Sequence, residues 1–355
     1  MKKNAAPVRV MMVEDSPVVR HLLMHIIEQD PRLTVAAAFS TAEEALQQLP
    51  TVRPDVISMD VRLPGMNGLD ATRQIMTEFP TPIVIIAGDL EDSSLQISMN
   101  ALRAGALSVV EKPVGESHGK YLDVAGTICT QLYIMSQVAV VRRRVIGGEW
   151  RSGATSSAPD VEIGPPSMVG IAASTGGPPA LAKLLAGMPA EPAAPVAIVQ
   201  HMGPVFMEGF ASWLDSVVPQ RVKLAQDQEI ARPGTVYVAP GDRHLEVRPG
   251  GVLRLNASAP LRGQRPSATI LFKSIAEHYG ARGLGIVLTG MGEDGAEGLL
   301  ELRRAGGRTI AEDQSTAVVY GMPAAAVRLG AASLSLPLNL IGPRVATMLR
   351  RDAKA

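Results

Sequence analysis

Two side chains in the second half of the chain could together perform nucleophilic catalysis. Ser174 follows the apolar run "MVGIAA" and is surrounded by small residues. A serine hydroxyl attacks an acyl carbon only when a positioned base takes its proton. Of the six histidines, His201 directly follows the apolar run "VAIVQ" and so is expected at the same sheet edge as Ser174. We therefore predict Ser174 as the nucleophile and His201 as the base.

A carboxylate after a third apolar run would orient the base. "LGIVLTG" leads into "MGEDG", which places Asp294 just before a predicted helix, with Glu293 as the alternative. An aspartate here could also act only as a helix N-cap. The glycines of this loop expose backbone N–H groups, which can stabilise a developing oxyanion. We predict the Met291 amide as donor, with Thr175 or its neighbours contributing from the first loop.

Two other interpretations of the "STGG" loop fit the sequence less well. Glycines between a strand and a helix can bind phosphate, but the stretch lacks the spacing and the lysine of a P-loop. Ala172 replaces the first glycine of a G-x-S-x-G elbow, and the order Ser, His, Asp differs from that of α/β-hydrolases. A standard lipase or esterase is therefore disfavoured.

The first half of the chain contains a second group of reactive side chains. Glu14 and Asp15 follow "VRVMMV", Asp60 follows "DVISM", and Lys112 ends the fifth apolar run. Each acidic residue alone could be a turn residue or an N-cap. Together at one sheet edge they would repel, and an all-oxygen site of this kind suits Mg²⁺. With a metal and a lysine to neutralise charge, one carboxylate could accept a phosphoryl group.

Alternating strands and helices must position both groups. From 8 to 113, short apolar runs alternate five times with segments of helical period, which predicts a parallel sheet covered on both faces. A Gly-, Ser- and Pro-rich stretch follows, and then seven further strand candidates from Met168 onward. We predict an α/β protein with two doubly wound parallel-sheet domains, at 1–145 and 167–355, joined by a linker at 146–166.

Composition excludes several classes of protein. The chain has 355 residues, with 34 basic and 34 acidic side chains, so no net charge would attract nucleic acid. No apolar run reaches membrane-spanning length, and the N-terminus has no signal-peptide core. The single cysteine, Cys129, excludes an internal disulfide and suits a reducing compartment. We expect a cytoplasmic protein that neither inserts into membranes nor binds nucleic acid.

The first half resembles the receiver domain of bacterial response regulators, which is flavodoxin-like. The resemblance rests on "VEDS", "MDVRLPGMNGLD" and "EKP". It implies that Asp60 accepts phosphate from a histidine kinase, that Glu14 and Asp15 help to hold Mg²⁺, and that Lys112 contacts the phosphoryl group.

Two switch positions of the receiver pattern differ in this chain. Ala87, or Gly88 if the register slips, stands where receivers usually have Ser or Thr. Val109 stands where they usually have an aromatic residue. We expect phosphorylation to activate weakly, or through Ser93 or Ser94.

The second half resembles the Rossmann-like catalytic domain of the CheB-type chemotaxis methylesterases. The resemblance rests on "GIAASTGG", "VQHM", "YVAPGDRHLEV", "RPSATILFKSIAEHYG" and "VLTGMGEDGAEGL". It implies a triad of Ser174, His201 and Asp294 that demethylates glutamate methyl esters of chemoreceptors and deamidates glutamines, without a cofactor. Arg262 and Arg265 are candidate contacts for acidic receptor helices, or solvated loop charges. A different serine hydrolase and a non-enzymatic adaptor are the alternatives.

Overall fold

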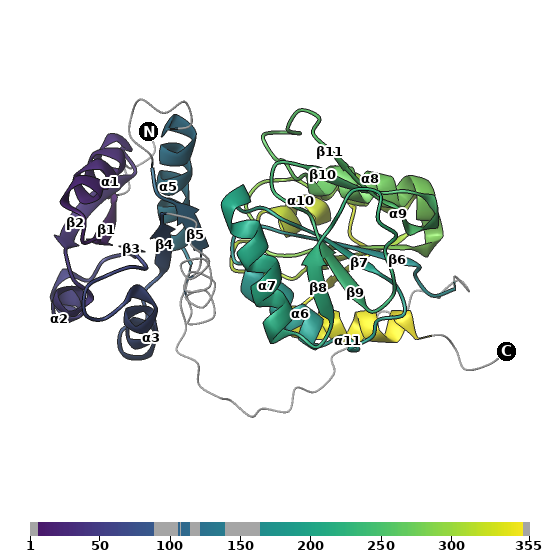
Figure 1. Cartoon of the computed structure of the whole chain (residues 1–355), viewed down its shortest axis with the longest axis horizontal. Helices are drawn as coiled ribbons and strands as arrows, with labels where there is room; N and C mark the ends of the chain where they lie inside the picture. The colour runs from purple at the N-terminus through teal and green to yellow at the C-terminus, as the bar shows by residue number, and fades with distance from the viewer. Residues whose placement is uncertain (1–5, 89–105, 107, 114–120, 139–163, 351–355) are drawn as a thin grey trace.

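The computed structural model describes residues 6–88, 106, 108–113, 121–138 and 164–350. Its described strands form a parallel sheet in each half of the chain and one two-stranded antiparallel sheet, and helices flank both parallel sheets (Figure 1). The predicted α/β fold class is confirmed. Most of the predicted linker lies outside the described residues, so the domain boundaries stay a prediction. In the described part of the chain, no helix has both the length and the apolar character needed to cross a bilayer.

The N-terminal sheet has the strand order β2-β1-β3-β4-β5. Its strands are β1 (Val8–Val13), β2 (Leu33–Phe39), β3 (Val56–Met59), β4 (Ile83–Ala87) and β5 (Ser108–Glu111). The described helices around it are α1 (Pro17–Gln29), α2 (Ala42–Val52), α3 (Gly68–Glu78) and α5 (Tyr121–Ser136). Because β1 pairs with β3 in a register that matches Val13 with Met59, the residues after these two strands meet at one edge.

The start of α1 illustrates how the sequence places this edge. The Ser16 hydroxyl caps the helix by accepting from the Val19 N–H, and Pro17 begins the first turn, where its missing N–H is not needed. The chain therefore turns sharply after Glu14 and Asp15, which leaves both carboxylates at the end of β1.

The C-terminal sheet has seven parallel strands in the order β14-β13-β12-β6-β7-β9-β8. Its strands are β6 (Met168–Ala173), β7 (Val196–Gln200), β8 (Arg221–Leu224), β9 (Thr235–Val238), β12 (Gly283–Val287), β13 (Arg308–Glu312) and β14 (Leu334–Leu336). All seven correspond to predicted strands. Strand β6, which is buried along its whole length, lies between β12 and β7. The loops after these three neighbouring strands contain Asp294, Ser174 and His201.

Six α-helices and three short 3₁₀ turns accompany this sheet in the described part of the chain. The α-helices are α6 (Gly177–Ala186), α7 (Met207–Val217), α8 (Ala268–Tyr279), α9 (Ala296–Arg304), α10 (Met322–Arg328) and α11 (Leu338–Leu349). Short 3₁₀ turns are η1 (Pro204–Phe206), η2 (Pro249–Gly251) and η3 (Gly280–Arg282). The sequence did not predict α11, which contains Pro343. Gly342 permits close packing of α11 on α6, since a Cβ there would lie 2.4 Å from the Leu184 carbonyl oxygen.

An antiparallel hairpin provides two strands besides the seven of the large sheet. It consists of β10 (His244–Val247) and β11 (Leu253–Asn256). The hairpin forms a separate two-stranded sheet and is linked to α8 through the Ser274 hydroxyl, which accepts from the Val247 N–H at 2.9 Å.

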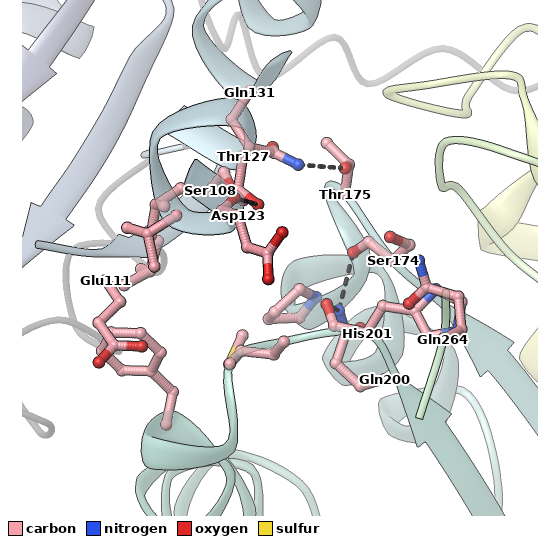
Figure 2. Close-up of a pocket in the computed structure, with 18 of the residues that line it drawn as sticks. Ser108, Glu111, Asp123, Thr127, Gln131, Ser174, Thr175, Gln200, His201 and Gln264 are labelled. Carbon is pink, nitrogen blue, oxygen red and sulfur yellow. Dashed lines mark hydrogen bonds between the residues drawn. The ribbon is translucent and has the colours of Figure 1, made fainter. Parts of the chain in front are cut away.

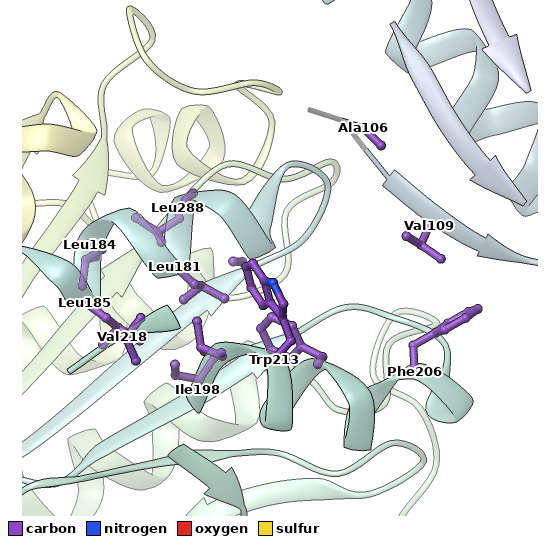
Figure 3. Packing of buried hydrophobic residues seen from close by; sticks show 14 of the residues in the cluster. Ala106, Val109, Leu181, Leu184, Leu185, Ile198, Phe206, Trp213, Val218 and Leu288 are labelled. Atoms are coloured by element: carbon purple, nitrogen blue, oxygen red, sulfur yellow. The ribbon is translucent and has the colours of Figure 1, made fainter. Parts of the chain in front are cut away.

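A cluster of buried apolar side chains extends across both halves of the chain. Ala106 and Val109 belong to it on the N-terminal side, and Phe206 and Trp213 on the C-terminal side. Figure 3 shows Val109 lying across from Phe206. The two halves of the chain are therefore in apolar contact through β5 and the turn before α7.

Candidate active site

His201 and Asp294 form the central contact of the site. His201 Nε2 lies 2.9 Å from Asp294 Oδ2, and both side chains are almost fully buried. Because Nε2 is engaged by the carboxylate, Nδ1 is the nitrogen that remains for a serine. In the chymotrypsin arrangement the two ring nitrogens have the opposite partners.

Ser174 lines the same cavity as His201 and is only partly buried. Its hydroxyl makes no hydrogen bond to another residue in the described part of the chain. The hydrogen bond between a catalytic nucleophile and its base is often long without substrate and shortens in the reactive complex. The structure thus brings the three residues that the sequence predicted together at one cavity.

The Asp294 carboxylate is held by several donors at the start of α8. It accepts from the Ser267 hydroxyl at 2.8 Å and from the backbone N–H groups of Ala268 and Thr269 at 2.6 and 3.1 Å. Burial alone would raise the pKa of Asp294, but hydrogen bonds from His201, Thr269 and Ser267 hold that pKa well below its usual range. The positive end of the helix dipole also favours the ionised form. Asp294 therefore caps α8 and contacts the histidine with the same carboxylate.

The alternative orienter, Glu293, points elsewhere. Its carboxylate pairs with Arg328 and lies 3.6 Å from Arg262, whose other nitrogen pairs with Glu297. Arg265 donates to two backbone carbonyls at 3.1 and 3.2 Å. Both arginines suggested as receptor contacts thus have partners within the chain.

Two backbone amides next to Ser174 are available as oxyanion donors. Neither the Thr175 N–H nor the Met291 N–H makes a hydrogen bond to a residue that the structure describes. The Met291 loop lies against the nucleophile, because a Cβ on Gly290 would come within 2.7 Å of the Ser174 Cβ. The geometry is compatible with the predicted donors.

A cavity of about 430 Å³ connects the site to the N-terminal half. Ser174, Gln200 and His201 line it from one side, and Asp123 and Gln131 of α5 line it from the other (Figure 2). Gln131 Nε2 donates to the Thr175 hydroxyl at 3.4 Å. Access to Ser174 is therefore restricted by α5 and by β5, which contributes Ser108 to Glu111 to the lining.

The acidic group of the N-terminal half also assembles as predicted. Ligand oxygens of Glu14, Asp15 and Asp60 lie within 4.8 Å of one another. Lys112 Nζ lies 2.9 Å from Asp60 Oδ2 and donates to Glu14 Oε1 at 3.1 Å. Glu14 Oε2 is also buried and lies 2.9 Å from Lys112 Nζ, so the lysine ammonium pairs with this carboxylate as well. A hard divalent metal with oxygen ligands fits this donor set.

Burial dominates the electrostatics of this acidic group. It raises the pKa of both Glu14 and Asp60, and the negative charge of Asp60 raises the pKa of Glu14 further. Burial would lower the pKa of Lys112, but the adjacent Asp60 and Glu14 carboxylates raise it overall. With three carboxylates and one lysine, the site has a net negative charge when the carboxylates are ionised, which favours a bound cation.

The two switch positions occur where the sequence placed them. Ala87 is the last residue of β4, and its carbonyl oxygen accepts from the Lys112 N–H at 2.8 Å. Gly88 follows the strand and lies against the Lys112 side chain. Ser93 and Ser94 lie outside the described residues. Neither Ala87 nor Val109 can act as the hydroxyl or the aromatic ring of a typical receiver switch.

Sequence reasoning overlooked Gln200. This residue ends β7, is 1% exposed, and donates from Nε2 to the carbonyl oxygens of Ser174 and His201, both at 2.9 Å. The signal was a polar residue at the end of the otherwise apolar "VAIVQ", immediately before the predicted base.

Comparisons with known proteins match both halves of the chain. A family model described as CheB methylesterase matches residues 169–345, and one described as response regulator receiver domain matches residues 10–120. The protein-glutamate methylesterase/protein-glutamine glutaminase 2 of Paramagnetospirillum magneticum is 52% identical over 341 residues, which cover 95% of this chain and 96% of the relative.

A second relative and a solved structure agree with these matches. The protein-glutamate methylesterase/protein-glutamine glutaminase 4 of Myxococcus xanthus is 42% identical over 351 residues, with coverage of 97% and 98%. The crystal structure of the Thermotoga maritima CheB methylesterase catalytic domain is 37% identical, with a TM-score of 0.50. It covers 52% of this chain and 98% of that domain.

Proposed function

We propose a role for each residue of the two sites, starting from the fact that the chain belongs to the CheB methylesterase family and carries a response regulator receiver domain. It is a receiver-regulated protein-glutamate methylesterase and protein-glutamine glutaminase. The reaction removes methyl groups from glutamate methyl esters of chemoreceptors and serves chemotactic adaptation. The contact between His201 Nε2 and Asp294, beside Ser174, carries the assignment of the residues.

In the first step, Ser174 Oγ attacks the side-chain carbonyl carbon of the methyl ester while His201 Nδ1 takes the hydroxyl proton. The carbonyl oxygen becomes an oxyanion, which the N–H groups of Thr175 and Met291 stabilise. The C–O bond to the methoxy group then breaks, and His201 returns the proton so that methanol leaves. A glutamine would react in the same way and release ammonia.

In the second step, water attacks the acyl-enzyme. His201 takes a proton from the water, the tetrahedral species collapses, and the proton passes to Ser174 Oγ as the glutamate carboxylate is released. Asp294 remains ionised throughout, because its donors hold its pKa well below the usual range. It orients the imidazole and stabilises its positive charge. These steps need no cofactor.

In the receiver, Asp60 is the proposed acceptor of a phosphoryl group from a histidine kinase. Glu14, Asp15 and Asp60 would hold Mg²⁺, which when bound neutralises negative charge on the carboxylate and phosphoryl oxygens. Lys112 contacts Asp60 and can contact the phosphoryl group once Asp60 carries it.

The receiver regulates the esterase by covering it. Strand β5 and helix α5 line one side of the active-site cavity, and Gln131 is bonded to Thr175. The unphosphorylated receiver therefore limits the approach of a receptor helix. We also propose the domain division 1–145 and 167–355 and a cytoplasmic location, which the single buried cysteine, Cys129, suits.

Methanol release from a methylated chemoreceptor fragment tests the function. The wild-type chain is expected to release methanol at a rate that depends on Ser174, and the Ser174→Ala chain is expected to release none above background. Equal release by the two chains, with the variant folded, would contradict the assignment of the nucleophile.

A further inference from the structure

We propose that Gln200 is a positioning residue that orients the peptide unit between Ser174 and Thr175 and thereby aims the Thr175 N–H at the oxyanion. The inference rests on the proposed function, because it assumes that Ser174 is the nucleophile. It adds a residue whose buried side-chain amide acts through the backbone.

The Gln200 side-chain amide joins the backbones of the nucleophile and the base. Its Nε2 donates to the carbonyl oxygen of Ser174 and to that of His201, both at 2.9 Å. Ser174 and His201 follow neighbouring strands, since Ala173 pairs with Gln200 in the register of β6 and β7. One amide group therefore fixes the two loops relative to each other.

The planarity of the peptide bond converts this contact into the direction of a donor. In a trans peptide unit the C=O and N–H groups point in opposite directions. The Ser174 carbonyl is held by Gln200 Nε2 at 2.9 Å and by the Gly177 N–H at 2.8 Å. The Thr175 N–H of the same unit must therefore point away from both donors.

The neighbouring peptide units are held by Thr289, which follows β12, the strand next to β6. The Ser174 N–H donates to the Thr289 carbonyl at 3.0 Å, and the Thr289 hydroxyl donates to the Thr175 carbonyl at 2.8 Å. The Thr175 N–H is the group left without a partner among the residues that the structure describes. The N–H and carbonyl of Ser174 and the carbonyl of Thr175 are thus fixed by hydrogen bonds, which leaves the Thr175 N–H as a preorganised donor for an oxyanion.

Packing alone does not account for a glutamine at this position. Nε2 must face the two carbonyls, because Oε1 would repel both of them. Oε1 is then buried without a hydrogen-bond partner in the described structure, and it lies where a Cβ on Gly177 would come within 2.0 Å. An unpaired buried acceptor is unfavourable. An apolar side chain of similar length would avoid that penalty, so the function of Gln200 lies in what its Nε2 holds.

Gln220 provides a matched control within the same domain. It is 2% exposed, its Nε2 donates to the backbone carbonyls of Leu185 and Pro189 at 2.9 and 2.7 Å, and its Oε1 is likewise buried and unpaired. It does not line the active-site cavity. Because the two glutamines have matching environments, Gln220→Met should change stability in the same way as Gln200→Met, without an effect on the oxyanion.

The experiment compares Gln200→Met, Gln200→Glu and Gln220→Met in the full chain. Methionine keeps the length without a donor, and glutamate keeps the shape but presents two acceptors to the carbonyls. We measure the melting temperature, kcat and KM for a methylated receptor fragment, and inhibition by phenylboronic acid, whose serine adduct places a negative oxygen in the oxyanion site. Loss of an oxyanion donor lowers kcat by about 10²–10³-fold, so a misdirected donor is expected to lower it by about 10–100-fold.

We expect both Gln200 variants to lower kcat and the affinity for phenylboronic acid by a similar factor, while KM changes little. Gln220→Met is expected to keep kcat and the inhibitor affinity at wild-type values. Wild-type kcat in a folded Gln200→Met chain overturns the inference, as does a lowered kcat with unchanged inhibitor affinity. If the methionine variant does not fold, Gln200→Glu decides by the same criteria. Full turnover by Ser174→Ala would instead overturn the proposed function on which the inference rests.

Discussion

Gln131 of the receiver donates a hydrogen bond from its side-chain amide to the hydroxyl of Thr175, the residue that follows the nucleophile. This contact joins α5 to the proposed oxyanion loop over a distance of 3.4 Å between Nε2 and Oγ1. A single substitution can therefore test how the receiver covers the active site.

Gln131→Ala is expected to raise the basal methylesterase rate of the unphosphorylated chain. A neutral hydrogen bond contributes about 0.5–1.5 kcal/mol, so the closed arrangement should lose at most about tenfold in its equilibrium constant. The rate of methanol release without a phosphoryl donor measures the effect. Gln137→Ala is the control, because Gln137 is exposed beyond the end of α5 and does not line the cavity. An unchanged rate in Gln131→Ala would show that the contact does not restrict access.

Removal of the receiver extends this test. A fragment that starts at Gly164 contains the whole seven-stranded sheet and its own buried core, so we expect it to fold alone. Its methylesterase rate should equal or exceed that of the unphosphorylated full chain, because β5 and α5 no longer line the cavity. Circular dichroism and methanol release provide the two measurements. A folded but inactive fragment would mean that the receiver completes the site.

Substitutions in the proposed triad should show whether Asp294 or its neighbour Glu293 orients His201. Ser174→Ala and His201→Ala are each expected to lower kcat by about 10⁵–10⁶-fold, since triad members act as a unit. Asp294→Asn should have a smaller effect, about 10³–10⁴-fold, because the oxyanion amides stay in place. Glu293→Gln should change kcat by no more than about threefold, because Glu293 pairs with Arg328 and Arg262 on the surface. A larger loss in Glu293→Gln than in Asp294→Asn would reverse the assignment of the orienter.

Much of this architecture follows from strand order, which periodicity reveals. The seven strand candidates of the second half are the seven strands of its sheet, and Ser174, His201 and Asp294 were predicted as a triad because each follows one of them. The carboxylates of the first half were found for the same reason. A parallel sheet places such residues at one edge regardless of how the loops are folded.

Features that depend on side-chain contacts between distant segments could not be predicted. Nothing in the sequence indicates that His201 turns its Nε2 toward Asp294, because that choice depends on ring orientation in a folded loop. The partners of Arg262 are acidic residues 31 and 35 positions away, which periodicity does not connect to it. Helix α11 was missed because Gly342 and Pro343 usually interrupt helices, whereas here glycine permits contact with α6.

Glu312 should make the stability of the catalytic domain depend on pH. Its carboxylate is fully buried at the end of β13 and accepts from the Thr289 N–H at 2.8 Å and from the Thr316 hydroxyl at 3.0 Å. Burial raises the pKa of Glu312 above 4.5 even though both donors oppose the change. The folded state thus holds this proton more tightly than the unfolded state, so the contribution of Glu312 to the free energy of unfolding falls as pH rises from 4.5 through the raised value.

Glu312→Gln removes this titration because glutamine stays neutral. The free energy of unfolding of the variant relative to wild type should therefore increase as pH rises through that window, as measured by urea unfolding at several pH values. Glu301→Gln, at an exposed position paired with Lys273, is the control and should show little such trend. If the free energies of unfolding of the wild type and Glu312→Gln differ by the same amount at all pH values, the raised pKa of Glu312 is contradicted.

The receiver switch is expected to respond weakly to phosphorylation. A phosphoryl group at Asp60 would normally draw a hydroxyl at the end of the fourth strand toward it, and an aromatic side chain on the fifth strand would fill the vacated space. Ala87 has no hydroxyl, and Val109 is already packed in the apolar cluster that contains Phe206 of the catalytic domain. A hydrogen bond to a charged group contributes about 1.5–3 kcal/mol, comparable with a typical coupling energy of about 1–3 kcal/mol. Its absence can therefore remove most of the activation.

Introducing a hydroxyl at position 87 should couple phosphorylation to the methylesterase rate. We expect a phosphoryl donor with Mg²⁺ to raise the methylesterase rate only a few-fold in the wild-type chain and not at all in Asp60→Asn. In Ala87→Thr the same donor should raise the rate by about tenfold or more. Ala87→Val matches threonine in size without the hydroxyl, so it should respond no better than wild type. Strong activation of the wild-type chain that requires Asp60 and that Ala87→Thr does not increase would show that phosphorylation is transmitted by a route other than this hydroxyl.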